Sequence, residues 1–269
     1  MKNNTILGVT LMLCLSITTI SCKKKPKEGP ATQSNCDTKY EVLFGDAVST
    51  NEPVTIAYEK GQIKNFNSSS FILDYEYAGD KVNISFAGKP LYIIEVSNNL
   101  ATKVIDVKTT FEQRMSYDGN RNLVKIDYYF DNSLTDTKIL TYANGNLNTL
   151  TQTFNDNSGS KRVTTYSYST DIAGKTDNDN RHLLFGVADQ FIPMQLLGTT
   201  SKNILTKTVY TNTSENFRSD ITKTYTYSKS PNGSTNKIVE DSYTLTVSNG
   251  KETQNENFKR TIVINTSCN

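Results

Sequence analysis

The stretch Ser70-Phe71-Ile72-Leu73-Asp74-Tyr75-Glu76-Tyr77-Ala78-Gly79-Asp80-Lys81-Val82 contains a strand, a turn and the start of a second strand. From Leu73 to Tyr77 apolar and polar side chains alternate, which is typical of a strand with one face on a core and the other in water. Gly79-Asp80 then supplies residues that favour a turn. This pattern predicts antiparallel β-structure.

The same pattern continues to the end of the chain. Residues 220–227 and 241–247 alternate in the same way and are rich in Thr and Tyr, both of which favour strands. Between such runs stand further turn dipeptides: Asp118-Gly119, Asn144-Gly145, Asn232-Gly233 and Asn249-Gly250. The sequence therefore predicts a mainly β protein with one antiparallel sheet.

A loose repeat connects several of these turns: a tyrosine, a glycine two or three residues later, and then an apolar residue. The repeat occurs at residues 58–63, 77–82, 117–123 and 142–147. Each unit is predicted to be a β-hairpin, and a series of hairpins predicts a curved up-and-down sheet that is open and half-barrel-like. The alternative is that any antiparallel sheet contains such turns by chance.

One segment interrupts the strand pattern. Residues 183–198 have apolar side chains at helical spacing, Gly198 suits a helix end, and Pro193 limits the helix to short pieces. We predict a short helical insert near 183–198 that plugs the concave side of the sheet, either as plain core packing or as a lid over a ligand cavity. Its apolar residues are Leu183, Leu184, Phe185, Val187, Phe191, Ile192, Met194, Leu196 and Leu197.

The N-terminus has the features of a bacterial export signal. Lys2 is the only charge ahead of an apolar run from Ile6 to Ile20. As a helix this run would be about 22 Å long, which is too short for a hydrocarbon core of about 30 Å. The run therefore predicts a signal peptide over residues 1–21 rather than a membrane span.

The signal ends at Thr19-Ile20-Ser21-Cys22, which resembles a bacterial lipobox with Thr19 in place of the usual Leu. The resemblance implies cleavage before Cys22 and lipid on its thiol, and several acyl chains would anchor the protein stably. Residues 22–35 are predicted to be a tether and residues 36–269 a β domain. The alternative is an ordinary cleaved signal in which Cys22 has no role.

The location follows from the predicted lipid. Lys23 is not the Asp that retains lipoproteins at the inner membrane, so we expect a cell-envelope protein anchored in the outer membrane. The basic stretch Lys23-Lys24-Lys25 slightly favours the periplasmic leaflet over the cell surface. An exported domain lies in an oxidising compartment, so we predict that Cys36 and Cys268 form a disulfide between the first and last strands. Two free thiols are the alternative.

The insert carries a more specific resemblance. Phe185-Gly186, Pro193, Leu196-Leu197-Gly198 and Ser201-Lys202-Asn203 follow hairpins similar to the YD repeat. This combination resembles a Bacteroidetes lipoprotein family of unknown function. The resemblance implies the fold and the envelope location and implies no activity.

No constellation of catalytic or metal-binding residues stands out. The chain has one histidine, His182, no Gly-x-Ser-x-Gly motif and no glycine-rich phosphate loop. The body after the tether is close to neutral, so no positive field favours nucleic acid. We therefore predict no enzyme, no cofactor and no metal site.

Three functions remain open at the level of sequence. The first is a lipid-anchored, non-catalytic envelope protein that binds a protein partner or an apolar ligand. The second is a periplasmic carrier of lipid or lipoprotein acyl chains, which would need an apolar cavity beneath the insert. The third is a glycan-binding accessory lipoprotein, which would use a row of exposed tyrosines on the concave face.

Overall fold

A computed structural model describes residues 36–44, 54–59, 62–68, 71–156, 159–172, 191–229 and 235–268. The chain divides into two units, 1–33 and 34–269, and all described residues belong to the second. The predicted signal peptide, Cys22, the tether and His182 lie outside the described residues.

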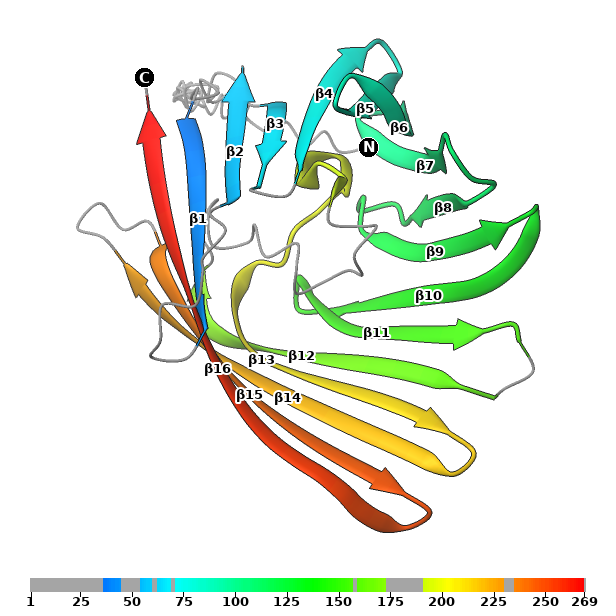
Figure 1. Cartoon of the computed structure of the whole chain (residues 1–269), viewed down its shortest axis with the longest axis vertical. Coiled ribbons are helices and arrows are strands. Elements are labelled where there is room, and N and C mark those ends of the chain that lie inside the picture. Colours follow the sequence, from blue (N-terminus) through cyan, green and yellow to red (C-terminus); the bar gives the residue numbers. More distant parts are fainter. Residues whose placement is uncertain are drawn as a thin grey trace, which may run out of the picture. The chain divides into compact units, whose positions relative to one another are not determined.

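Nearly all of the described chain is β-structure (Figure 1). The sixteen strands are β1 (Cys36–Phe44), β2 (Val54–Glu59), β3 (Gln62–Asn67), β4 (Ile72–Ala78), β5 (Lys81–Phe86), β6 (Lys89–Ser97), β7 (Leu100–Asp106), β8 (Glu112–Tyr117), β9 (Leu123–Phe130), β10 (Ser133–Ala143), β11 (Asn146–Phe154), β12 (Lys161–Ile172), β13 (Asn203–Ser214), β14 (Phe217–Lys229), β15 (Thr235–Ser248) and β16 (Lys251–Cys268). A short 3₁₀ helix, η2 (Met194–Leu196), lies between β12 and β13.

Each strand pairs antiparallel with its neighbours in sequence, so the prediction of a mainly β protein with one curved up-and-down sheet is confirmed. The expected open, half-barrel-like outline needs one correction. β1 pairs with both β2 and β16, and these ladders close the sheet into a barrel. Closure depends on pairing between the two ends of the domain, which local alternation along the sequence does not reveal.

All four units of the tyrosine–glycine repeat form hairpins, as predicted. In each hairpin the tyrosine lies opposite the apolar residue of the repeat: the pairs are Tyr58–Ile63, Tyr77–Val82, Tyr117–Leu123 and Tyr142–Leu147. Asn144 and Gly145 have φ values of 53° and 78°, as a two-residue type I′ turn requires. The predicted turn Asn232-Gly233 lies outside the described residues.

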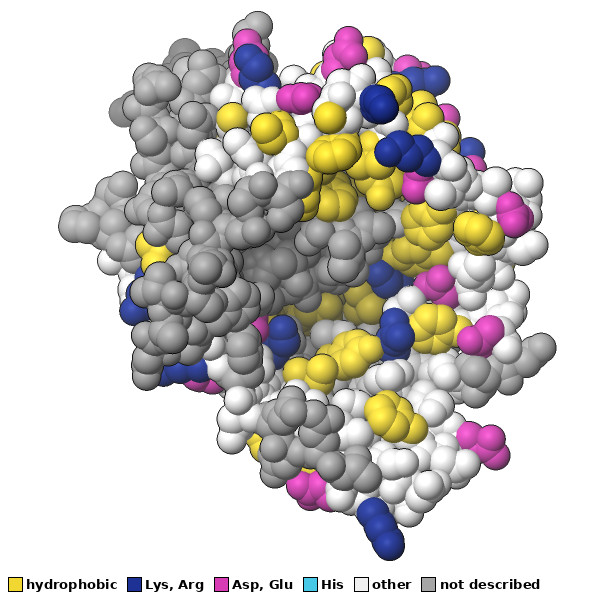
Figure 2. Space-filling model, viewed as in Figure 1, with side chains coloured by type: hydrophobic (Ala, Val, Ile, Leu, Met, Phe, Trp, Pro, Cys, Tyr) yellow, Lys and Arg dark blue, Asp and Glu magenta, His cyan; other side chains and the backbone are white. Residues whose placement is uncertain are grey.

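The two faces of the sheet differ in polarity. Buried apolar side chains form one cluster that includes Ile192, Leu196 and Leu197 of the insert, so the core lies inside the barrel. In Figure 2 hydrophobic side chains gather around the hollow. The outer face carries ion pairs such as Lys103–Glu112 at 2.6 Å. Within the described part of the chain, no helix is long and apolar enough to cross a membrane.

Strand order gives the barrel two distinct ends. The hairpin turns β2–β3, β4–β5, β6–β7, β8–β9 and β10–β11 and the insert between β12 and β13 lie at one end, which we call the mouth. Because the strands alternate in direction, β1 starts and β16 ends at the mouth as well. The connections β3–β4, β5–β6, β7–β8 and β9–β10 lie at the opposite end, which we call the far end.

Candidate functional site

The described part of the insert has four buried side chains: Pro193, which is less than 2% exposed, and Ile192, Leu196 and Leu197, with exposed fractions of 1%, 7% and 6%. Met194 lies in η2, and its side chain is not described. Leu183, Leu184, Phe185 and Val187 lie outside the described residues. The described part of the insert therefore packs inside the barrel, while its role as a plug or a lid stays a prediction.

An aromatic cluster packs around the start of the described insert. The ring of Phe191 lies edge-on to Phe66 and Phe71, at centroid distances of 6.0 Å and 5.9 Å, and Phe66 and Phe71 stack on each other. The ring of Tyr92 also stacks on Phe191, with a distance of 6.4 Å between the ring centroids. Four rings from β3, β6, the β3–β4 connection and the insert thus fill this part of the barrel.

Tyrosine hydroxyls from the inner wall bind the insert. Tyr75 Oη donates to the carbonyl of Phe191 at 2.9 Å, and Tyr117 Oη lies 3.2 Å from the carbonyl of Leu196. Tyr168 Oη lies 3.0 Å from Ser201 Oγ. Buried tyrosines need partners for their hydroxyls, and here the insert supplies them. The glycan-binding hypothesis expected a row of exposed tyrosines, whereas Tyr75 is only 7% exposed and these hydroxyls are directed at protein atoms.

The repeat hairpins also bind the insert through their turns. Gly198 pairs with Asn122 and has a φ of +85°, and a Cβ there would lie 2.1 Å from the carbonyl oxygen of Arg121. Thr199 N donates to that same carbonyl at 3.0 Å, and Lys202 N donates to the carbonyl of Gly145 at 3.0 Å. A glycine is therefore needed at position 198 for two reasons: the backbone there lies close to the hairpin, and its φ is positive.

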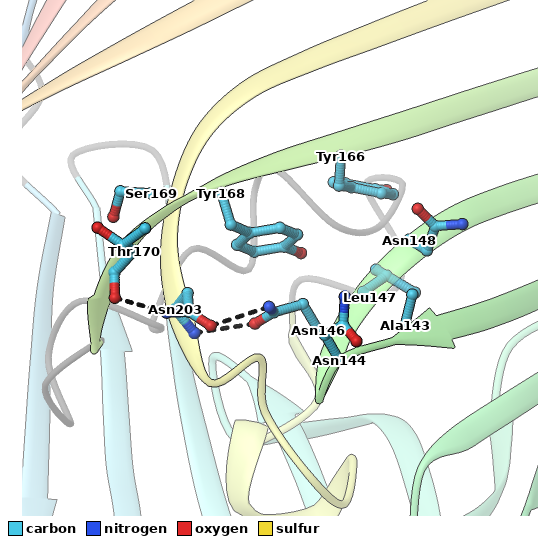
Figure 3. A pocket seen from close by; sticks show the side chains of 10 residues that line it. All are labelled: Ala143, Asn144, Asn146, Leu147, Asn148, Tyr166, Tyr168, Ser169, Thr170 and Asn203. Carbon is cyan, nitrogen blue, oxygen red and sulfur yellow. Dashed lines mark hydrogen bonds between the residues drawn. The ribbon is translucent and has the colours of Figure 1, made fainter.

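Beside these contacts lies a pocket of about 440 Å³ (Figure 3). Its lining is made of Ala143, Asn144, Asn146, Leu147, Asn148, Tyr166, Tyr168, Ser169, Thr170 and Asn203. Asn146 Nδ2 donates to Asn203 Oδ1 at 3.0 Å, and Asn203 N donates back to Asn146 Oδ1 at 2.8 Å. The pocket thus combines amide groups with two tyrosine rings.

Burial keeps the tyrosines of this region in the neutral form. Burial, with a smaller contribution from Tyr168, raises the pKa of Tyr142 to about 12. The pKa values of Tyr117 and Tyr166 are also raised, again chiefly by burial. A neutral phenol can donate a hydrogen bond, so these side chains act as donors over the physiological pH range.

A second candidate surface lies at the far end of the barrel. Five of the large hydrophobic side chains that are exposed lie on four consecutive connections, β3–β4 to β9–β10: Ile72, Phe86, Val107, Phe130 and Leu134, at 49%, 39%, 45%, 50% and 37%. We call them the apolar rim. Thr110 Oγ1 and the backbone N–H of Asp131 lie 3.1 Å apart, which ties the β7–β8 loop to the β9–β10 turn. Exposed apolar groups that gather at one end of a molecule mark interaction surfaces.

The two body cysteines occupy paired backbone positions. Cys36 lies opposite Cys268 in the register of β1 and β16. Directly opposite Cα atoms in antiparallel strands are about 4.5–5.5 Å apart, which lies within the range that a disulfide spans. The disulfide stays a prediction, and we expect a thiol assay of the unfolded, unreduced body to find no free thiol.

Among the described residues, no group of three or more His, Cys, Asp or Glu side chains could hold a metal ion. No family model matches the chain, and no curated protein matches it. Among solved structures the chain is similar to a porin-like protein from Bacteroides uniformis, with 17% identity and a TM-score of 0.66. The match covers 88% of this chain and 99% of the other. At this identity the likeness is one of fold.

The apolar rim and the pocket were not predicted from the sequence. Phe86 and Phe130 end strands whose inner faces are apolar, so in the sequence they resemble core residues. The usable signal was an aromatic residue directly before a turn, where the strand leaves the core. The pocket depends on Asn146 and Asn203, which are 57 residues apart, and no local pattern connects them.

Proposed function

We propose that this chain is a lipid-anchored, non-catalytic binding protein of the cell envelope that docks a protein partner on the apolar rim. The observation that carries the proposal is the gathering of exposed apolar side chains at one end of a barrel whose outer wall is polar. The β domain and its single sheet are established, whereas the envelope location and lipid on Cys22 are parts of the proposal.

The direction of the chain supports this arrangement. β1 starts at the mouth, so the described domain begins at the end opposite the apolar rim. A tether of fourteen residues from Cys22 extends at most about 45–50 Å. In this arrangement the lipid holds the mouth towards the membrane, and the apolar rim faces away from it.

The charges near the apolar rim favour a protein over a lipid surface. The connections of the apolar rim carry two lysines and two aspartates, so basic and acidic groups are balanced there: Lys89 at β5–β6, Asp106 and Lys108 at β7–β8, and Asp131 at β9–β10. Anionic membranes attract clusters of basic residues. Protein interfaces combine an apolar centre with a polar surround of mixed charge, which is the pattern here.

Site-specific photo-crosslinking in the native host tests the proposal. A photoreactive phenylalanine analogue at Phe86 or Phe130 is expected to capture one and the same protein. The matched control positions are Ile139 and Tyr243, which are 42% and 38% exposed but lie on the outer wall within β10 and β15. Equal products from rim and wall, or no product from the rim, would contradict the docking role.

A glycan-binding role is the second candidate, because the mouth pocket carries two tyrosine rings and four asparagines. Amides and aromatic rings together suit sugar hydroxyls and sugar faces. Asn148→Ala is the test variant, since Asn146 and Asn203 also hold the insert. Screening the soluble body on a glycan array should yield a ligand whose binding weakens in this variant. Unchanged binding of every retained glycan would remove this role for the pocket.

The wider resemblance to Bacteroidetes lipoproteins of unknown function remains part of the proposal. Three of its described motif residues, Pro193, Gly198 and Lys202, pack on or bond to the barrel. Binding of an apolar ligand and carriage of acyl chains require an open apolar cavity beneath the insert, and the described part of the insert is packed against the core.

A further inference from the structure

The barrel wall has a gap between β11 and β12 at the mouth. The ladder that joins these two strands ends at the pair Thr149–Thr165. β11 nevertheless begins at Asn146 and β12 continues to Ile172, so in the described register both strands run on towards the mouth without pairing to each other. The pocket of Figure 3 lies in this gap, because its lining comes from these unpaired parts, the end of the β10–β11 hairpin and Asn203.

A gap of the same kind between β7 and β8 is crossed by a side chain. The β7–β8 ladder ends at the pair Lys103–Arg114, although β7 begins at Leu100 and β8 continues to Tyr117. Tyr117 Oη donates across this gap to the carbonyl of Ala101 at 2.8 Å, and Ala101 is 0% exposed. The gap between β11 and β12 instead retains about 440 Å³ of space. The end of a ladder therefore does not by itself make a pocket, which depends on the side chains around the gap.

The insert fixes the width of the gap between β11 and β12. On the β11 side, Leu147 N donates to Ser201 Oγ at 3.1 Å, and on the β12 side Asn203 Nδ2 donates to the carbonyl of Thr170 at 3.1 Å. The reciprocal bonds between Asn146 and Asn203 complete this bridge. Both strands thus bond to the insert in place of each other. The pocket is preformed, which lowers the entropic cost of binding a ligand there.

The lining of the pocket is polar and carries no charge, since all ten of its residues are uncharged. An ionised ligand would lose water there without gaining a counter-charge, so the lining favours a neutral ligand. Asn148 and Thr170 are exposed, and an amide and a hydroxyl can each donate and accept hydrogen bonds. Figure 3 shows the ring of Tyr168 beside the Asn146–Asn203 pair, where the ring supplies an apolar face.

We propose that this gap binds the terminal hexose of a neutral saccharide, with a face of the sugar ring against Tyr168 and its hydroxyls on Asn148 and Thr170. Pockets for small molecules span about 300–1,000 Å³, and this pocket lies near the lower end of that range, which suits one sugar ring. The proposal rests on the glycan-binding role and narrows it to uncharged sugars and to this gap. It is independent of docking on the apolar rim.

Nitrogen–proton correlation spectra of the soluble body, residues 34–269, test the proposal. The probes are the methyl glycosides of glucose, galactose and mannose, each paired with its uronide, at constant pH and ionic strength. We expect at least one neutral probe to shift the backbone amides of residues 146–148 and 166–170 saturably. Its uronide, which differs in the charged carboxylate, should bind at least tenfold more weakly.

The outcomes separate this inference from the wider glycan-binding role. Saturable shifts confined to residues outside the gap would overturn the gap as the site and leave the wider role standing. Uronides that bind as tightly as the neutral probes would overturn the selection for uncharged sugars. The absence of a saturable shift with every neutral probe would overturn the inference, while the glycan array would still decide the wider role.

A charge placed in the lining gives a sharper test of the selection. Asn148→Lys supplies a counter-charge for a carboxylate, so it should strengthen binding of the uronide at least fivefold. Thr153→Lys is the matched control, because Thr153 is an exposed position on the same strand outside the pocket. It should leave the affinity for the uronide unchanged. Equal gains in both variants would show a general effect of charge and would contradict the site.

The role of the tyrosine ring is tested at Tyr168. Tyr168→Leu removes the ring and should weaken binding of the neutral probe at least tenfold. Tyr168→Phe keeps the ring and loses only the hydroxyl that lies 3.0 Å from Ser201 Oγ, so it should retain most of the affinity. Equal losses in the two variants would show that the hydroxyl positions the insert and that the ring does not contact the sugar.

Discussion

The inner wall of the barrel has two parts that differ in the polarity of their buried side chains. On β3 to β7 it is apolar, with Ile63, Leu73 and Ile94 packed against the aromatic rings around the insert. On β8 to β15 the same inward positions include Gln113, Lys138 and Glu240. The first part contributes stability through dense packing. In the second part, buried polar groups lower the stability of the fold, and proteins keep such groups mainly where they bind something.

The largest effect is expected from a cavity in the apolar part. Ile94 is 0% exposed, so Ile94→Ala should lower the free energy of unfolding by about 2–5 kcal/mol. Urea unfolding of the soluble body measures this loss. Ile139→Ala, at a 42% exposed position on the outer wall, should cost under about 0.5 kcal/mol. Similar losses at the two positions would remove the distinction between core and outer face.

A smaller loss is expected from the polar part. Glu240 is 1% exposed, and its Oε1 lies 3.2 Å from Lys223 Nζ and from Ser242 Oγ. Glu240→Gln removes the charge that Lys223 faces and should cost about 1–3 kcal/mol, because the lysine keeps a third of its side chain in water. The same urea assay measures the loss. A stabilised variant would indicate that the pair serves only specificity.

Each hydrogen bond from a tyrosine hydroxyl to the insert should contribute less to the free energy of unfolding than the Glu240–Lys223 pair. Tyr117→Phe removes a hydroxyl that donates to the carbonyl of Ala101 at 2.8 Å and lies near that of Leu196, at an expected cost of about 0.5–1.5 kcal/mol. Tyr243→Phe, at an exposed outward position, is the control and should be neutral. Amide exchange in residues 195–203 should speed up in the first variant alone.

The smallest expected effect is the loss of stability at alkaline pH that comes from Tyr142 at the mouth. The folded pKa of Tyr142, about 12, is above the ordinary value of 10, so its contribution is complete below pH 10. As pH rises from 10 to 12 the unfolded chain loses this proton first, and stability falls over that window. The phenolate absorbance of the parent body minus that of Tyr142→Phe should show one group that titrates near pH 12. A difference that titrates near pH 10 would contradict the burial of Tyr142.

Much of the fold could be predicted from local pattern. Each tyrosine of the repeat lies opposite its apolar partner across a turn, because both belong to one hairpin. Closure does not follow from local pattern, since it depends on the pairing of β1 with β16 across the whole domain. The predicted disulfide between Cys36 and Cys268 pointed to contact between the first and last strands, and these two residues do lie opposite each other. The polar inner wall was also missed. In a strand such as β10, where Asp136 and Lys138 face inward, alternation separates two faces and does not tell which one is inside.

In the proposed arrangement, lipid on Cys22 holds the mouth towards the membrane while the apolar rim faces away. A fluorophore is placed at Asn98, in the β6–β7 turn of the mouth, or at Phe130 of the apolar rim, in lipidated protein on vesicles that carry a headgroup quencher. We predict strong quenching at Asn98 and little at Phe130. Both signals should become equal and weak in Cys22→Ser. Stronger quenching at Phe130 than at Asn98 would contradict the account.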